Sequence, residues 1–320
     1  MKAIRVQQFG EPEVLQLVAL PDLAPGPGQI LVRVHAAGIN PVETYKRSGK
    51  YPLLPELPYT PGTDGAGEIA ALGSGVTGWK TGDRVYLAGS LSGTYAEQAL
   101  CEPAQVHPLP EAVSFTQGAA LGVPYTTAHV ALFHRGQARA GESILIHGAT
   151  GGVGLAAVQI ARAAGMRVLA TGGTEAGRAL VQREGADAVF DHHSGAYAKE
   201  ILDATGGRGV DVILEMLANV NLGKDLPMLA PDGRVIVVGS RGPVEINARD
   251  LMFRNADIRG VFVFGTPPSV LGETHRALVE GLEKGELRPV IAREFPLAQA
   301  AQAHGAVVSS GVMGKIVLVM

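Results

Sequence analysis

The chain has 320 residues, a formal net charge of -3 and 18% charged residues, a profile typical of a globular protein with room for two domains. The acidic balance provides no general positive field for nucleic acid or anionic lipid. The single cysteine, Cys101, excludes an internal disulfide and a multi-cysteine zinc lobe. A chain with one cysteine and no disulfide is consistent with a reducing cytoplasm.

The N-terminal residues alternate between apolar and polar side chains and lack the apolar core of a signal peptide. Glycine, proline or charge interrupts every apolar run well before the roughly 18 residues of a membrane span. We therefore expect a cytoplasmic protein with no membrane segment.

The first part of the chain, up to about residue 124, is rich in proline and glycine and contains short alternating runs. Strands are expected at Ile30–Ala36 and after the turn at Gly82, with Tyr95–Ala99 continuing the latter. This pattern predicts a mostly-β domain.

Between residues 125 and 265, buried apolar strands alternate with longer helical segments, which predicts βαβ units and a parallel sheet. The helix between the first two strands is expected at Val153–Ala164, ending at Gly165. The expected strands are Ser143–His147, Arg167–Thr171, Ala188–Phe190, Val210–Leu214, Arg234–Val238 and Ile258–Phe264.

After Pro267-Pro268 the chain contains one helix, near residues 273–284, and a final strand, Lys315–Val319, too little for a second sheet. The tail is therefore expected to return to the N-terminal domain. The predicted class is α/β, with residues 1–124 and 266–320 in one domain and residues 125–265 in the other.

A glycine turn follows the strand at Ser143–His147 and precedes the alanine-rich helix. Glycines at 148, 151 and 154 permit a tight turn, close approach of a pyrophosphate and close packing of helix on strand. The helix N-terminus adds unpaired N–H groups and partial positive charge. The order of strand, turn and helix predicts a dinucleotide site.

The next strand ends at Gly172-Gly173-Thr174, where NAD-preferring sites usually carry an acidic residue for the ribose 2′-hydroxyl. Because an acid here would repel a 2′-phosphate, its absence favours NADPH. Arg178 and the pair His192-His193 are within plausible reach of that phosphate. The residues alone leave open whether these three bind the nucleotide or only occupy the surface.

Several segments resemble the zeta-crystallin quinone oxidoreductases, zinc-free members of the medium-chain dehydrogenase/reductase superfamily. The resemblance extends over nearly the whole chain and is carried by Gly38–Tyr45, Pro58–Gly62, Glu215–Leu222 and Gly233–Gly242. It implies a GroES-like domain joined to a Rossmann domain, NADPH as cofactor, and reduction of quinones in a cleft between the domains.

The resemblance also implies that no metal is used. Zinc-dependent relatives carry Gly-His-Glu where this chain has Gly62-Thr63-Asp64. A catalytic zinc usually takes three protein ligands, and neither this segment nor Cys101 can supply the familiar set.

Carried over position by position, the family pattern places Tyr45 beside the nicotinamide, and Gly173 and His192 around the ribose phosphate. The basic residue that some relatives carry just after Gly173 is absent. The remaining cofactor positions implied are Thr150, Gly151, Gly152 and Val153 on the pyrophosphate, and Asn221, Val238, Gly239, Ser240, Arg241, Val261, Phe262 and Val263 along the cofactor.

Without a metal to polarise a carbonyl, the acceptor must be electron-poor, as a quinone is, and the protein mainly aligns two rings. Asn40, Tyr45 and Tyr51 are expected near the quinone oxygens, where a hydrogen bond stabilises developing negative charge. For the tyrosines, a purely packed ring remains open.

Two alternatives also remain open. Reduction of an enone double bond needs the same cofactor plus a proton donor. Some zeta-crystallins bind AU-rich RNA or serve as bulk lens protein, although the acidic balance makes RNA a secondary partner at best.

The segment Ile258–Phe264 is expected to form the last strand of the Rossmann sheet, at an edge that must be covered. Pairing with the same strand of a second subunit predicts a homodimer or a dimer of dimers.

Overall fold

A computed structural model describes residues 1–320, which form two compact units. Unit 1 contains Met1–Val123 and His275–Met320, and unit 2 contains Pro124–Thr274. The second boundary lies within helix α9 (Pro268–Glu283), later than the expected position after residue 265. The reason lies in two neighbouring side chains: Thr274 Oγ1 is 3.0 Å from Nδ1 of His129 in unit 2, whereas His275 Nδ1 is 2.9 Å from the Tyr86 hydroxyl in unit 1.

Unit 1 is built on a seven-stranded sheet that is antiparallel except at one edge. Its order is β14 (Ile291–Pro296), β15 (Lys315–Val319), β3 (Ile30–Gly38), β4 (Asp64–Leu72), β5 (Arg84–Ala88) and β7 (Val106–Pro108), with β6 (Gln98–Cys101) also paired to β3. A separate ribbon joins β1 (Lys2–Arg5) to β2 (Gln16–Ala19). The strand expected at Tyr95–Ala99 therefore begins later, at Gln98, and it pairs antiparallel with β3 instead of continuing the strand after Gly82.

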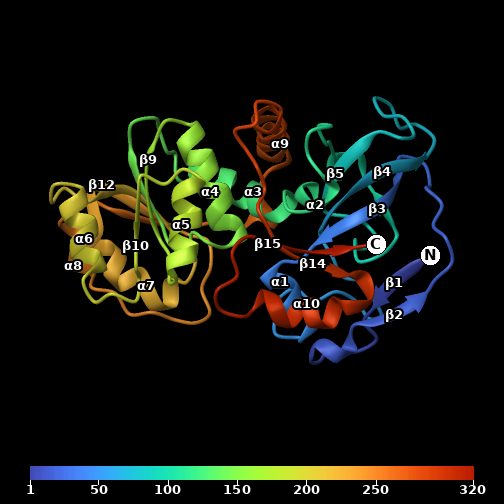
Figure 1. Ribbon diagram of the computed structural model, residues 1–320, viewed down its shortest axis with the longest axis horizontal. Helices are drawn as coiled ribbons and strands as arrows, with labels where there is room; N and C mark the ends of the chain where they lie inside the picture. Colours follow the sequence, from blue (N-terminus) through green and yellow to red (C-terminus); the bar gives the residue numbers. More distant parts are fainter. The chain divides into compact units, whose positions relative to one another are not determined.

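The C-terminal segment is an integral part of unit 1. Strand β15 pairs antiparallel with β3, with Leu318 opposite Ala37, and α10 (Ala300–Val307) packs against α1 (Pro41–Arg47). Figure 1 shows these red C-terminal elements beside the blue N-terminal ones. Their shared core includes Ile4, Ile39 and Phe295. The remaining helix of unit 1 is the short α2 (Phe115–Gly118).

Unit 2 contains a six-stranded sheet in which every pair is parallel. Its order is β10 (Ala188–Phe190), β9 (Arg167–Thr171), β8 (Ser143–Ile146), β11 (Val210–Glu215), β12 (Leu229–Val237) and β13 (Asp257–Gly260). All four side chains of β8 are buried, because a central parallel strand is covered on both faces. This is the predicted doubly wound α/β class.

Helices connect these strands. Helix α4 begins at Gly152 and ends at Ala163, and Gly165, with φ +74°, turns the chain toward β9. The other helices in this part of the chain are α3 (Gly122–His129), which continues as a π-helix over Val130–Arg135, α5 (Glu175–Arg183), α6 (Tyr197–Ala204), α7 (Ala218–Asp225) and α8 (Ala248–Met252). None of the helices combines the length and apolar content needed to cross a membrane.

The last strand of unit 2 is shorter than predicted. Strand β13 ends at Gly260, and Val263–Gly265 forms a 3-10 turn in place of the expected strand through Phe264. Its only neighbour, β12, ends at Val237 opposite Gly260. The Val261 N–H still donates to the Val237 carbonyl oxygen over 3.0 Å, but β12 offers no ladder partner to the residues after Val261.

The thiol of Cys101 is fully buried in β6, and burial raises its pKa to about 12. Since the thiolate is the reactive form, we expect Ellman's reagent to leave the native protein unmodified and to modify one thiol per chain after unfolding in urea. Rapid modification of one thiol under native conditions would contradict the buried placement.

Candidate functional site

The glycine turn of unit 2 connects β8 to α4 and has the geometry of an anion site. Gly148 adopts φ +57°, and Gly151 is the N-cap of α4 without any side chain that caps the helix. The first N–H groups of the helix therefore remain available to a negatively charged ligand. A Cβ on Gly151 would meet no protein atom closer than 3.6 Å, so this position is open from the protein side.

Gly154 has a different role in the same turn. A Cβ there would lie 2.5 Å from the carbonyl oxygen of Gly148 and 2.6 Å from the Cα of Ala149. Only glycine permits this close packing of helix on strand. The three glycines thus differ in role: Gly148 makes the turn, Gly151 leaves space for a ligand, and Gly154 allows the helix to pack on the strand.

A second part of the site follows β9. A Cβ on Gly173 would lie 2.8 Å from Nε2 of His192 and 2.7 Å from Nε2 of His193. Both imidazoles therefore pack directly against this glycine. Burial, and then the neighbouring His193, lower the pKa of His192. The Arg178 guanidinium lies 3.1 Å from Asp191 and 3.3 Å from the carbonyl oxygen of Gly172. A basic group therefore does stand at the end of β9, although an aspartate partly neutralises it.

The third part consists of the turns after β11 and β12. Asn221 Nδ2 donates to Glu215 Oε1 over 3.2 Å, and the Val238 N–H donates to the Glu215 carbonyl oxygen over 2.9 Å. The Arg241 N–H donates to Oδ1 of Asn219 over 2.8 Å. These contacts connect the two turns to each other.

The cofactor positions expected from the sequence share one edge of the parallel sheet. They lie in segments that follow β8, β9, β10, β11, β12 and β13, and the carboxyl ends of these strands form the usual ligand-binding edge of such folds. By strand, the positions are Thr150, Gly151, Gly152 and Val153; Gly173; His192; Asn221; Val238, Gly239, Ser240 and Arg241; and Val261, Phe262 and Val263.

The predicted substrate residues of unit 1 have different surroundings. Tyr45, on α1, and Tyr51, just beyond it, are partly buried, and neither phenol oxygen has a hydrogen-bond partner. The Lys46 ammonium lies 5.7 Å from the centre of the Tyr51 ring. Both hydroxyls are thus free to meet a ligand.

Asn40 differs from this expectation, because it is 3% exposed and both of its side-chain polar atoms are engaged inside unit 1. Its Nδ2 donates to Asp64 Oδ2 over 2.9 Å, and its Oδ1 accepts from the Lys315 ammonium. Asn40 thus belongs to a buried network that fixes the start of α1, and its side chain has no free polar atom for a quinone oxygen.

The same network includes one further carboxyl group, Glu43, and one phenol, Tyr95. Glu43 accepts from the Asn40 N–H over 2.9 Å and from the Tyr95 hydroxyl over 2.6 Å. Burial, reinforced by Asp64, raises the pKa of Glu43. Its other oxygen accepts from the Thr63 N–H over 2.9 Å, which fixes the backbone of the turn before β4.

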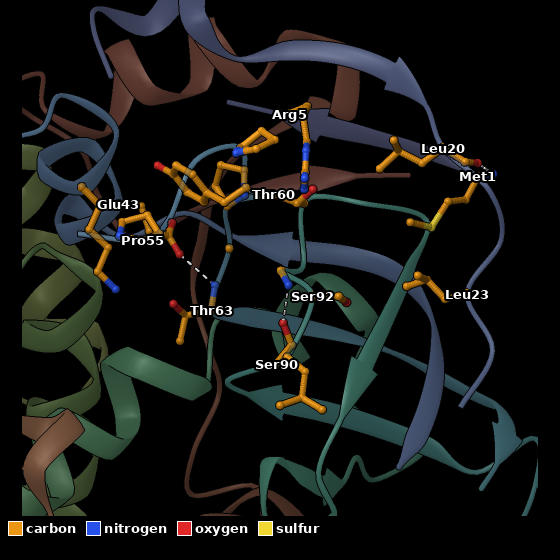
Figure 2. A pocket seen from close by; sticks show the side chains of 17 residues that line it. Met1, Arg5, Leu20, Leu23, Glu43, Pro55, Thr60, Thr63, Ser90 and Ser92 are labelled. Atoms are coloured by element: carbon orange, nitrogen blue, oxygen red, sulfur yellow. Dashed lines mark hydrogen bonds between the residues drawn. The ribbon is translucent and has the colours of Figure 1, made fainter. Parts of the chain in front are cut away.

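Unit 1 also contains a cavity of about 480 Å³ whose lining includes Thr63 and Glu43. Figure 2 shows Arg5, Thr60 and Thr63 around it, together with Ser90 and Ser92 of a nearby loop. Tyr45 and Tyr51 do not line this cavity.

One buried cluster of unit 2 is absent from the expectations drawn from the sequence. His147, Glu215 and Asp225 are each at most 2% exposed and bring potential metal-ligand atoms within 4.8 Å of one another. A signal did exist, because His147 and Glu215 are polar residues that directly follow the apolar runs Ile144–Ile146 and Val212–Leu214. Their proximity depends on strand order, which local sequence does not reveal.

Two family models match the chain: the alcohol dehydrogenase GroES-like domain over residues 26–111 and the zinc-binding dehydrogenase family over residues 152–280. The quinone oxidoreductases of rat and human are 53% and 50% identical to it, and each alignment covers 100% of this chain and 98% of the relative. The structure of Escherichia coli quinone oxidoreductase complexed with NADPH is similar over 100% of both chains, with a TM-score of 0.89 and 30% identity. The chain therefore belongs to the quinone oxidoreductases of the medium-chain dehydrogenase/reductase superfamily, as its motifs predicted.

Proposed function

We propose that this protein reduces quinones with NADPH and without a catalytic zinc. The observation that carries the proposal is the similarity over the whole chain, at about 50% identity, to quinone oxidoreductases. The absence of zinc is supported by the stretch Gly62-Thr63-Asp64, which has no histidine where the resemblance implies the zinc ligand of zinc-dependent relatives. A threonine hydroxyl is a poor substitute for a zinc-binding imidazole.

The residues of unit 2 fit NADPH. The open Gly151 and the uncapped start of α4 suit the pyrophosphate. Gly173 with His192, and Arg178 beside Gly172, suit the 2′-phosphate, since no acid directly follows β9. Asn221, the turn Val238–Arg241 and the segment Val261–Val263 would line the rest of the molecule. When bound, NADPH supplies the hydride that reduces the acceptor.

Tyr45 and Tyr51 are the groups of unit 1 that we assign to the substrate, since their hydroxyls are unpartnered. A phenol can donate a hydrogen bond to a quinone oxygen as negative charge develops on it. Asn40 acts indirectly, because its bonds to Asp64 and Lys315 fix the first turn of the helix that carries Tyr45.

We expect Tyr51→Phe and Tyr45→Phe each to lower kcat/KM for 9,10-phenanthrenequinone by about tenfold, the effect of losing about 1.4 kcal/mol of hydrogen bonding in the transition state. NADPH oxidation at 340 nm measures this. Tyr125→Phe is the control, because the Tyr125 hydroxyl donates to Gln159 Oε1 within unit 2 and is assigned to neither substrate nor cofactor; it should behave as wild type. Unchanged rates in both test variants would remove the tyrosines from the proposal.

We also propose that two copies of the chain form a homodimer through the free edge of β13. We propose the cytoplasm as the location of this dimer. Next to this edge, Phe262 and Phe264 are 51% and 47% exposed, and a short open edge with neighbouring aromatic side chains is suited to pairing with a second copy. Light scattering at micromolar concentration tests this, and a monomeric mass would contradict it.

A further inference from the structure

The buried cluster of His147, Glu215 and Asp225 lies beneath the cofactor edge of unit 2. His147 follows β8, Glu215 ends β11 and Asp225 ends α7. His147 Nε2 lies 2.9 Å from Asp225 Oδ1 and 3.9 Å from Glu215 Oε2. Both carboxyl groups are 0% exposed, so water cannot compensate their charges.

The cluster lacks enough partners for two ionised acids. His147 Nε2, Glu215 Oε2 and both carboxyl oxygens of Asp225 have no well-aligned hydrogen bond. An unpartnered buried carboxylate is strongly disfavoured. Burial raises the pKa of Glu215 to about 7 and the pKa of Asp225 to about 7, and burial lowers the pKa of His147. Two buried carboxyl groups with oxygen atoms within 4.8 Å of each other titrate as a coupled pair.

No neighbouring group offers a buried positive charge. Tyr197 of α6 has its ring centre 6.3 Å from that of His147, and burial raises its pKa, which keeps it neutral. Lys224 is exposed and beside Asp225, so solvent screens it. His192, after β10, has a lowered pKa. A bound proton is therefore the simplest way to balance the negative charge of Glu215 and Asp225.

Glu215 connects the cluster to the cofactor edge. Its Oε1 accepts hydrogen bonds from the Leu217 N–H and from Asn221 Nδ2. Its carbonyl oxygen accepts from the N–H groups of Val238 and Gly239 over 2.9 and 3.2 Å. His147 immediately precedes Gly148, and its Nδ1 is 3.2 Å from the Thr171 hydroxyl at the end of β9. The charge of the cluster thus acts on the turns after β8, β9, β11 and β12.

We propose that His147, Glu215 and Asp225 form a proton-binding site that positions Asn221 and couples NADPH binding to the uptake of a proton from solvent. The inference rests on the proposed cofactor site. The sign follows from charge: the phosphates of NADPH are negative, so a cluster that holds its proton binds NADPH more tightly than one that has released it. Affinity is therefore expected to fall as pH rises through neutrality.

The experiment is calorimetric titration of the protein with NADPH at pH 7.5 in HEPES and in Tris, whose ionisation enthalpies differ. Dissociation constants are also measured from pH 6.0 to 8.5. We expect wild type to take up a fraction of a proton per NADPH and to lose about tenfold in affinity across this range, the equivalent of one pKa unit of coupling. Asp225→Asn keeps the shape of the side chain but removes one acid. It should take up fewer protons and show a smaller loss of affinity.

The 2′-phosphate of NADPH and His192 also titrate, but they do so equally in wild type and in Asp225→Asn. The difference in proton uptake between the two proteins therefore comes from the cluster. Glu215→Gln retains an acceptor for Asn221 and serves as the second variant if Asp225→Asn fails to fold. Equal proton uptake and equal pH slopes in wild type and variant would overturn the inference. So would one divalent cation per chain in metal analysis, because a cation would then balance the acids.

Asn221→Ala separates this inference from the proposed cofactor site. Weaker NADPH binding in Asn221→Ala together with a wild-type pH slope in Asp225→Asn would overturn only the inference. Unchanged affinity in Asn221→Ala would overturn both the assigned contact and the inference that depends on it.

Discussion

Replacing Lys315 by methionine should lower the free energy of unfolding by about 3–5 kcal/mol, the usual cost of removing one partner from a buried ion pair. Lys315 is 4% exposed and its ammonium is 2.8 Å from Oδ2 of Asp64, which is 0% exposed. The remaining partners of Asp64 are the Asn40 amide and the Val123 N–H, at 2.9 and 2.7 Å. These neutral donors cannot replace a full positive charge.

Urea denaturation followed by circular dichroism measures the loss. Lys284→Met is the matched control, because its partner Glu280 and the lysine itself are more than half exposed, and such a pair contributes only about 0.3–0.5 kcal/mol. The double variant Asp64→Asn/Lys315→Met should recover part of the stability, since it removes both charges. Equal losses in Lys315→Met and Lys284→Met would contradict the buried network.

Gly151→Ala should weaken NADPH binding by at least about tenfold, or 1.4 kcal/mol, while leaving the melting temperature unchanged. A Cβ at this position meets no protein atom within 3.6 Å, so the fold accepts it. The methyl group would instead occupy space that we assign to the pyrophosphate. Fluorescence titration with NADPH measures the affinity.

Two further glycines complete this test. Gly195→Ala lies in a surface turn with no atom near the added Cβ, and it should retain both affinity and stability. Gly154→Ala forces contact with the backbone of Gly148 and Ala149, so its melting temperature should fall. Wild-type affinity in Gly151→Ala would exclude the pyrophosphate from this turn.

The parts of the fold that the sequence predicted well are those that local residues determine. Strand β8, the glycine turn and α4 follow one another without interruption, and each has its own signal in burial, backbone freedom or helix propensity. Strand β13 shows the limit: the run Val261–Phe264 suits a strand, but β12 ends at Val237 and provides no further partner.

The buried networks were harder to predict for the same physical reason. Lys315 and Asp64 are 251 residues apart, and Lys315 and Asn40 are 275 apart, so only the order of strands β15, β3 and β4 brings them together. A lysine at the start of the apolar strand Lys315–Val319 does indicate a buried partner. It does not identify that partner, so the bonds of Lys315 to Asp64 and Asn40 could not be predicted from the sequence.

The most direct test of the proposed activity is the rate of NADPH oxidation at 340 nm by the purified, chelator-treated protein with 9,10-phenanthrenequinone, compared with NADH as donor and with an enone as acceptor. The structure and the family predict rapid turnover with NADPH and the quinone, slower turnover with NADH, and no effect of the chelator. Turnover with the enone alone, or activity only after zinc is added, would contradict a zinc-free quinone reductase.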